Sequence, residues 1–217
     1  MSPDVLALLA NGLLETTYMV AVSAIISTIV GIPLGVILVT TAKDHILEHL
    51  VLNRILGAIV NATRSTPFII LMVAIIPLTR LIVGTSIGTN AAIVPLTLAA
   101  IPFIGRVVES ALKEVDYGLI EAAQAMGASP RQIITKVLIP EALPAIIMGL
   151  TLAIIGLIGY SAMAGAIGGG GLGDLAIRYG YQRFRGDIML LTVIILIAQV
   201  QIVQTCGDYF ARRLNKR

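Results

Sequence analysis

Between Thr16 and Ala42 the sequence reads TTYMVAVSAIISTIVGIPLGVILVTTA, which is 27 consecutive residues without a charged side chain. A helix needs about 20 apolar residues to cross a hydrocarbon core of about 30 Å, so this stretch is long enough to span a membrane once. Four more uncharged runs, of 15, 25, 32 and 20 residues, lie at 65–79, 81–105, 142–173 and 188–207. The sequence therefore predicts several membrane-spanning segments.

The composition also indicates an integral membrane protein. Of the 217 residues only 12% are charged and 57% are hydrophobic, whereas about 25% of the residues of a soluble domain are charged. Backbone polar groups in lipid must be bonded internally, and the uncharged runs lack the alternation of barrel strands, so we expect helices. We predict an all-α membrane protein with one transmembrane domain over residues 1–217 and no separate soluble catalytic domain. The five expected spans are 15–41, 57–79, 85–106, 142–164 and 187–209.

Lysine and arginine are unequally distributed between the two sides of these five spans. One side carries ten of them: Lys43, Arg54, Arg106, Lys113, Arg131, Lys136, Arg212, Arg213, Lys216 and Arg217. The other side carries four: Arg80, Arg178, Arg183 and Arg185. Because basic loops stay on the cytoplasmic side, the amino end is expected outside and the carboxyl end inside, and no nucleic-acid partner is implied. Arg64, in the second span, can reach the cytoplasmic headgroups or line a pathway.

The longest connection between two expected spans is the cytoplasmic segment 107–141. Its residues 118–126 read GLIEAAQAM, which is rich in good helix formers, and Gly127 can end this helix in the left-handed conformation. The alanines make the helix slim enough to dock into a groove of another protein. The same residues also suit an interfacial helix that rests on lipid headgroups, and composition does not choose between the two interpretations.

A second short helix is predicted directly after the first. Ser129 can cap it, Pro130 fits its first position, and Gln132 can complete the capping box. Pro140 is expected to stop this helix before the fourth span begins.

The spacing within this segment resembles that of a known family. Glu121-Ala122-Ala123, three residues, Gly127, nine residues and then Val137-Leu138-Ile139-Pro140 resemble the E-A-A, x3, G, x9, I-x-L-P signature of permease subunits in bacterial ATP-binding cassette importers. Two of the last positions differ conservatively from the signature. The resemblance implies a coupling segment that fits into a cleft of a separate ATPase subunit. The residues that it assigns to coupling are Glu121, Ala122, Ala123, Ala125, Met126, Gly127 and Pro140.

Other stretches narrow the resemblance to the permeases of methionine importers. They are Arg64–Ile70, Ile82–Gly88, Ile93–Thr97 and Gly159–Met163. The resemblance implies a type I importer permease that acts as a homodimer in the bacterial inner membrane and carries D- and L-methionine. The implied partners are two cassette ATPase subunits, which bind ATP and Mg, and a periplasmic or lipid-anchored methionine-binding protein. Membrane lipid surrounds the spans, and the chain itself is expected to have no enzymatic activity and no cofactor.

Two stretches near the fourth span are candidates for the transport pathway. Tyr160, Ser161 and Met163 offer a phenol, a hydroxyl and a thioether, which suit a zwitterion with an apolar side chain, although such residues also occur simply as packing. Gly168–Gly173 satisfies G-x-G-x-x-G but follows a membrane helix instead of a strand, which argues against a dinucleotide site. We expect these glycines to form a mobile external turn or part of a gate.

Two other functional classes remain as alternatives. His45–His49 fits H-x-x-E-H, which can bind zinc on a helix in an intramembrane metalloprotease, but a third ligand is not apparent and a solvated loop explains the same residues. We therefore expect no metal. The second alternative is a secondary carrier or channel built from identical chains, against which the lack of ionisable residues within spans one, four and five argues. The single cysteine, Cys206, is expected to be a small buried hydrophobe.

Overall fold

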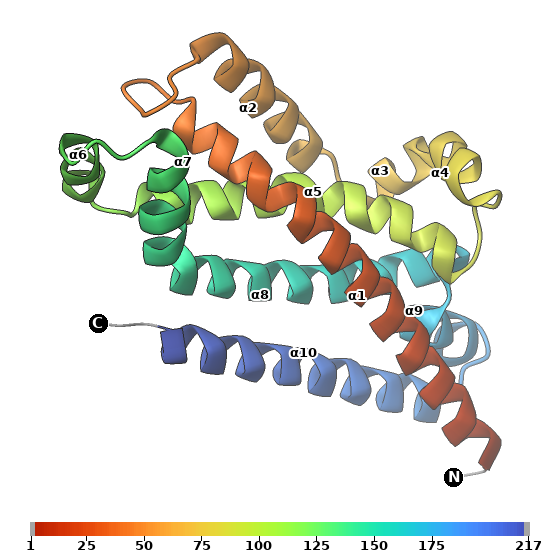
Figure 1. Cartoon of the computed structure of the whole chain (residues 1–217). Helices are drawn as coiled ribbons and strands as arrows, with labels where there is room; N and C mark the ends of the chain where they lie inside the picture. The colour runs from red at the N-terminus through yellow and green to blue at the C-terminus, as the bar shows by residue number, and fades with distance from the viewer. Residues whose placement is uncertain (1–2, 215–217) are drawn as a thin grey trace.

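The computed structural model describes residues 3–214, and all regular secondary structure in this range is helical (Figure 1). Lys216 and Arg217, which entered the predicted charge distribution, lie outside the described residues. The α-helices are α1 (Pro3–Thr40), α2 (Leu50–Ser65), α3 (Phe68–Ala74), α4 (Ile76–Val83), α5 (Thr89–Lys113), α6 (Tyr117–Ala125), α7 (Pro130–Ile133), α8 (Ile139–Ala164), α9 (Gly171–Leu175) and α10 (Gly186–Leu214). Three π-helical segments continue some of them, namely η1 (Ile134–Leu138), η2 (Gly165–Gly169) and η3 (Ala176–Tyr181).

The prediction of an all-α membrane protein is confirmed. Four helices of the described chain are long and apolar enough to cross a membrane: Asp4–Thr40, Thr89–Lys113, Pro130–Gly169 and Gly186–Leu214. The number of spans reaches five when α2 and α3 are taken together as one broken span.

The expected second span, 57–79, is not one continuous helix. The axes of α2 and α3 differ by 104° across Thr66 and Pro67. Thr66 is extended, with φ −83° and ψ 123°, because a proline ring disfavours the helical conformation of the residue before it. The proline thus divides the expected second span into helices of different direction.

The bundle is centred on the contact between α1 and α5, which cross each other over much of their length (Figure 1). Two glycines of α1 make this approach possible. A Cβ atom on Gly31 would lie 2.7 Å from Ile104, and one on Gly35 would lie 2.6 Å from Val108 and 2.7 Å from the carbonyl oxygen of Gly105. These two glycines form a G-x-x-x-G pattern, whose role here is close packing of α1 on α5.

The helix α5 runs without a break through Pro95 and Pro102. Membrane helices tolerate internal proline where neighbouring side chains bond the backbone groups that it frees. In α5 the carbonyls freed in this way are those of Ala91 and Leu98, whereas the Ser23 and Ser27 hydroxyls of α1 donate to the nearby carbonyls of Ile93 and Thr97, at 3.4 and 3.2 Å, and hold the two helices together beside the prolines.

The two ends of the bundle differ in the elements that they carry. One end holds α6, α7 and the carboxyl end of α10, and the opposite end holds the start of α1 together with α9 and the α3–α4 pair (Figure 1). Because α1 and α10 begin at the same end, an odd number of crossings separates the two termini. This arrangement agrees with the orientation expected from the basic residues, which stays a prediction.

Candidate coupling segment and transport pathway

The helix α6 begins and ends where its sequence predicts. The Asp116 carboxylate accepts a hydrogen bond of 2.8 Å from the Gly118 amide and so caps the first turn. At the other end Gly127 has a φ of 79°, the left-handed conformation that only glycine adopts without cost. The amides of Gly127 and Ala128 then bond the last carbonyl groups of the helix, at 2.9 and 3.0 Å.

The two faces of α6 have different surroundings. Ile120 and Ala123 are buried and belong to a core cluster with side chains of α1, α5, α7 and α8. The opposite face is exposed and carries Glu121, Ala122, Ala125 and Met126. Ala123, which the resemblance assigns to coupling, therefore does not lie on the exposed side, because it follows Ile120 by three residues and shares its face. Gly127 and Pro140 are exposed as well.

A polar contact connects α6 to the loop between α1 and α2. The Tyr117 hydroxyl donates to the backbone carbonyl of Asp44 over 3.2 Å. In the same loop Ile46 packs against the core cluster that contains Ile120. The helix is thus seated on the bundle by apolar contacts and by this hydrogen bond, while its outer face stays accessible.

The second short helix is capped as predicted, but Pro140 does not end it. Ser129 and Gln132 form a capping box, and Pro130 occupies the first turn. The chain then continues through η1 into α8, and the Ile139 amide bonds the carbonyl of Ile134, five residues earlier. This wider turn lets the chain pass a residue that has no N–H group and whose ring would otherwise crowd a carbonyl of the preceding turn. The expectation of a helix stop at Pro140 is therefore wrong.

The predicted pathway residues divide between two faces of α8. Tyr160 and Met163 are exposed by 37% and 48% and lie three residues apart on one face. The Tyr160 ring stacks on Phe68 of α3, with the ring centroids 4.6 Å apart. Ser161 is buried instead, and its hydroxyl donates to the carbonyl of Ile158 at 2.7 Å. The structure thus does not bring Ser161 onto the face that Tyr160 and Met163 share.

The glycine segment 168–171 is held by contacts from two other parts of the chain. The Glu15 carboxylate accepts a hydrogen bond of 2.6 Å from the Gly171 amide, and the Thr16 hydroxyl accepts one of 2.9 Å from the Leu172 amide. The Gly88 amide donates to the carbonyl of Gly168 over 2.8 Å. The segment follows α8 and η2 and leads into α9, so it does not have the strand-to-helix context of a dinucleotide site.

The His45–His49 motif lies in a loop and not on a helix. The Nδ1 atom of His49 accepts the Leu52 amide and caps α2, while Glu48 accepts the amide of Asp44. The two imidazoles therefore lack the common helical face that the H-x-x-E-H arrangement needs. Among residues 3–214 no group of three or more His, Cys, Asp or Glu side chains is placed to hold a metal ion.

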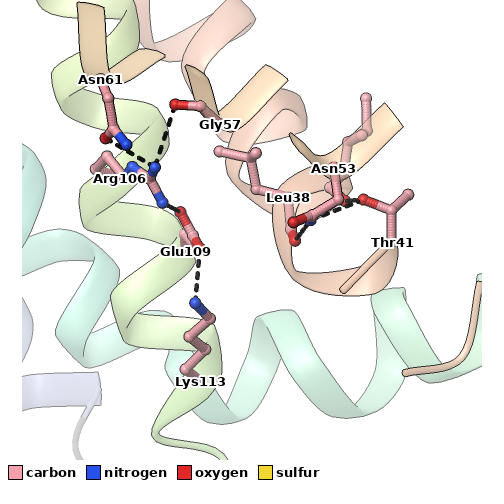
Figure 2. Close-up of polar contacts among 9 residues, drawn as sticks. Leu38, Thr41, Asn53, Gly57, Asn61, Arg106, Glu109 and Lys113 are labelled. Carbon is pink, nitrogen blue, oxygen red and sulfur yellow. Dashed lines mark hydrogen bonds and ion pairs between the residues drawn. The ribbon is translucent and has the colours of Figure 1, made fainter. Parts of the chain in front are cut away.

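A buried carboxylate near the carboxyl end of α5 was not foreseen from the sequence. Glu109 is 5% exposed and pairs with Arg106 at 2.5 Å and with Lys113 at 2.7 Å (Figure 2). The expected third span stopped at 106 because the first charged residue ended the apolar run, whereas α5 continues to Lys113. The spacing of three and four residues between opposite charges was the available signal that this stretch is still helical.

Comparison with known proteins assigns the chain to a family and to a fold. Residues 31–217 match the family described as binding-protein-dependent transport system inner membrane component. A relative from Vibrio cholerae, the "Probable D-methionine transport system permease protein MetI", is 60% identical over 97% of this chain and 93% of its own length. The "D-methionine transport system permease protein MetI" of Escherichia coli K12 is 53% identical over 76% of each chain.

Two solved structures are also similar to this chain. A chain of "Inward facing conformations of the MetNI methionine ABC transporter" is 48% identical, with a TM-score of 0.97 and complete coverage of both chains. A chain of an amino acid ABC transporter, solved "with histidines", is 19% identical, with a TM-score of 0.78 over 95% of this chain and 94% of its own, and shares the fold.

Proposed function

Because this chain belongs to the binding-protein-dependent transport system inner membrane component family, we propose that it is the membrane-spanning permease subunit of an ATP-driven methionine importer. Two copies of the chain form the translocation pathway for D- and L-methionine. Two cassette ATPase subunits bind ATP and Mg on the cytoplasmic side, and a periplasmic or lipid-anchored binding protein delivers methionine from outside. The chain is thus an inner-membrane component of a bacterial ABC transporter and not itself a hydrolase.

The likeness to the MetNI chain is the observation that carries the proposal. That chain belongs to a methionine transporter, and its type I importer fold agrees with this chain over the complete length of both. The sequence also lacks the G-x-x-x-x-G-K-[ST] loop that cradles nucleotide phosphates, so an ATP-driven cycle needs a second polypeptide.

In this proposal the exposed face of α6 inserts into a cleft of the ATPase. The outer residues Glu121, Ala122, Ala125 and Met126 provide a narrow surface, and Gly127 provides the sharp turn beside it. ATP binding closes the two ATPase subunits and moves the α6 helices. Since Ile120 and Ala123 are embedded in the core that joins α1, α5 and α8, the bundle follows α6 as a rigid body.

The face that carries Tyr160 and Met163 is the proposed pathway surface. It is exposed in the single chain, and a two-fold partner would place an equivalent face opposite to it. An aromatic ring, a thioether and the apolar residues of α3 suit the side chain of methionine. Rocking of the two bundles then opens this surface alternately to the two sides of the membrane.

Uptake of labelled methionine into reconstituted vesicles tests the proposal. Vesicles with the permease, the ATPase and the binding protein should accumulate methionine only when ATP is supplied, and vesicles with the permease alone should not. Uptake by the permease alone would favour the secondary-carrier alternative. A complete complex that hydrolyses ATP but does not move methionine would overturn the assigned substrate.

A further inference from the structure

The ion-pair group on α5 reaches across to a second helix. Arg106 donates from Nη1 to Glu109 and from Nη2 to the Oδ1 atom of Asn61 at 2.8 Å and to the Gly57 carbonyl at 3.4 Å (Figure 2). Asn61 and Gly57 belong to α2. One guanidinium therefore joins α5 to α2, and it is held in place by Glu109, which Lys113 binds from the other side.

Stabilisation of α5 alone does not explain this geometry. Pairs at three and four residues, such as Arg106–Glu109 and Glu109–Lys113, are sufficient to support a single helix. The contacts of Arg106 with α2 add nothing to that role. A planar guanidinium can bind a carboxylate and a second acceptor at the same time, which the ammonium group of a lysine in the same place cannot do with the same geometry.

The part of α5 that holds this group is also the part on which α6 rests. Val108 and Leu112, on either side of Glu109 in the sequence, are fully buried in the core cluster that contains Ile120 and Ala123 of α6. A displacement of α6 is therefore transmitted directly to residues 106–113 through close-packed side chains.

The helix α2, in turn, leads to the proposed pathway. It ends at Ser65, and after the bend at Pro67 the chain enters α3, whose Phe68 stacks on Tyr160. At its other end Asn53 donates to the Leu38 carbonyl and to the Thr41 hydroxyl of the α1 end, at 2.6 and 3.1 Å (Figure 2). Among the described residues Arg106 thus makes the side-chain hydrogen bonds that join α2 to α5. The Arg64 guanidinium of α2, 5.9 Å from the centre of the Phe103 ring, is a second contact between these helices.

We infer that Glu109 is a positioning residue that fixes the Arg106 guanidinium on α2, so that α2 and α3 move together with α5 when the ATPase displaces α6. The inference rests on the proposed function and extends it to the link between the coupling helix and the pathway. Without this link ATP hydrolysis continues, because α6 and its docking face are intact. The helices α2 and α3 then no longer move together with α6 in each cycle of hydrolysis, and methionine uptake per ATP hydrolysed decreases.

Three variants of the complete transporter test this link, each measured for uptake and ATP hydrolysis in the same vesicles. Glu109→Gln keeps the shape and removes the charge, Arg106→Lys keeps the charge and loses the second acceptor, and Asn61→Ala leaves both ion pairs untouched. We expect uptake per ATP to decrease by about fivefold or more in each, the scale of a typical coupling between sites. Asp187→Asn removes an exposed ion pair with Arg185 and serves as the matched control, with an unchanged ratio.

A merely structural role predicts a different pattern. It would lower uptake and hydrolysis in proportion, through the amount of folded complex, and would leave Asn61→Ala and Arg106→Lys close to the wild type. Unchanged uptake per ATP in those two variants overturns the inference.

A distance measurement separates this result from failure of the proposed function. Spin labels at Ile59 of α2 and at Glu114, just after α5, in a Cys206→Ser background should keep their separation upon ATP trapping in the wild type. In Glu109→Gln the separation should change. The measurement needs only the ATPase partner and no substrate, so it judges the link even if the transporter carries a compound other than methionine. An equal distance response in wild type and variant overturns the inference.

Discussion

Gly127 is the residue on which the proposed docking of α6 depends most directly. Its φ of 79° is unfavourable for a β-branched side chain, although no atom lies within 4 Å of the position that a Cβ would occupy. Gly127→Val should therefore cost about 1–2 kcal/mol through backbone strain alone. We expect weaker assembly with the ATPase and reduced uptake, measured by co-purification and by transport.

Gly127→Asn is the matched control, because asparagine adopts the left-handed conformation more readily than valine. The Gly127→Asn variant should assemble with the ATPase almost as well as the wild type. If Val and Asn variants both assemble and transport like the wild type, the docking role of this turn is excluded.

His45 makes the loop between α1 and α2 sensitive to pH. Burial lowers the pKa of its imidazole below the ordinary value of 6.5. The neutral form is thus favoured in the folded protein, so the unfolded chain binds more protons and the free energy of unfolding falls as the pH decreases through 6.5 towards the lowered pKa. We expect the Tm of the detergent-solubilised protein to be lower at acidic pH than at neutral pH.

The His45→Gln variant isolates this effect from the carboxylates of the same loop, Asp44 and Glu48. Its Tm should depend less on pH than that of the wild type over the same range. An identical pH dependence in both proteins would assign the effect to other groups.

The sequence predicts well the residues whose role is set by the local backbone. It predicts poorly which side of a helix is buried against its neighbours. The left-handed turn at Gly127 and the capping box at Ser129 follow from hydrogen bonds within four residues of the chain. Whether Ala123 or Ser161 faces the core is decided by which side of its helix meets a neighbour. Only its spacing from Ile120 marked Ala123 as an inner residue, and nothing of this kind marked Ser161, because serine fits either face of a membrane helix.

At the level of elements, the π turn η1 connects α7 to α8 just before Pro140. Two contributions to its stability oppose each other, namely the packing of the core and a backbone hydrogen bond. Ile133 and Leu138 are both buried, and they share one core only because the π turn between them shifts the helical register. If the π turn became an ordinary α-helical turn, Ile133 would rotate out of the core, which would destabilise the fold by about 2 kcal/mol. The hydrogen bond that an alanine at 140 could gain is worth about 1 kcal/mol.

The packing contribution is the larger of the two. Pro140→Ala should therefore keep the π turn and change the free energy of unfolding by less than about 1 kcal/mol. Ile133→Ala should cost about 2–4 kcal/mol, because it leaves a cavity in the core. Thermal unfolding gives the stabilities, and amide exchange of residues 134–139 reports whether the wide turn persists. A large stabilisation by Pro140→Ala with lost assembly would mean that the proline itself maintains the turn.

The seam between α1 and α5 should be sensitive to added side-chain volume. A side chain at Gly35 would meet both Val108 and the backbone of Gly105, which cannot move aside as a flexible side chain can. Gly35→Leu should destabilise the bundle by about 1–3 kcal/mol, as overpacking does elsewhere. The measurement is thermal unfolding in detergent.

Gly186→Ala at the start of α10 is the control, because no atom lies within 4 Å of its Cβ position. Its Tm should match the wild type. Equal tolerance at Gly35 and Gly186 would show that the two helices can separate without loss of stability.

The uncharged runs predicted four of the long helices but not their lengths, and they predicted the broken α2–α3 pair as one continuous span. Charged residues ended the expected spans, whereas α5 continues past Arg106 to Lys113 by pairing its charges along one side of the helix. The helix that contains α8 similarly begins at Pro130. Both helices extend beyond their apolar parts at the end of the bundle that carries α6 and α7, and an uncharged run detects only the apolar part.

At the level of the whole molecule, large parts of the helix surfaces have no partner within one chain. Only 11% of the most apolar part of α10 is buried, and Cys206 of this helix is exposed, in contrast to the expected buried position. α10 packs on α8 through one side only, where Gly207 closely approaches Thr151. Apolarity alone cannot tell whether lipid or a second copy covers the remaining surface, so the sequence could not predict which faces line the pathway.

The proposed homodimer predicts that Met163 lies close to its copy in the second chain. If the two-fold axis runs along the pathway, both copies of this exposed side chain approach each other while the outer side is closed. In a Cys206→Ser background, Met163→Cys should form a disulfide between two copies under mild oxidation without nucleotide, visible as a dimer on a denaturing gel. Trapping the ATPase in its closed state should reduce this product, because the bundles rotate apart at that end.

Leu14→Cys in the same background is the control. Leu14 is 68% exposed on α1 and lies beside Glu15, which binds the glycine segment that follows α8, so it occupies the same end of the bundle as Met163. It should not cross-link, because the proposed pathway face belongs to α8 and α3 and not to α1. A cross-link at Leu14 in place of Met163 would put the two-fold axis beside α1, and the face of Tyr160 and Met163 would then be open to lipid instead of substrate.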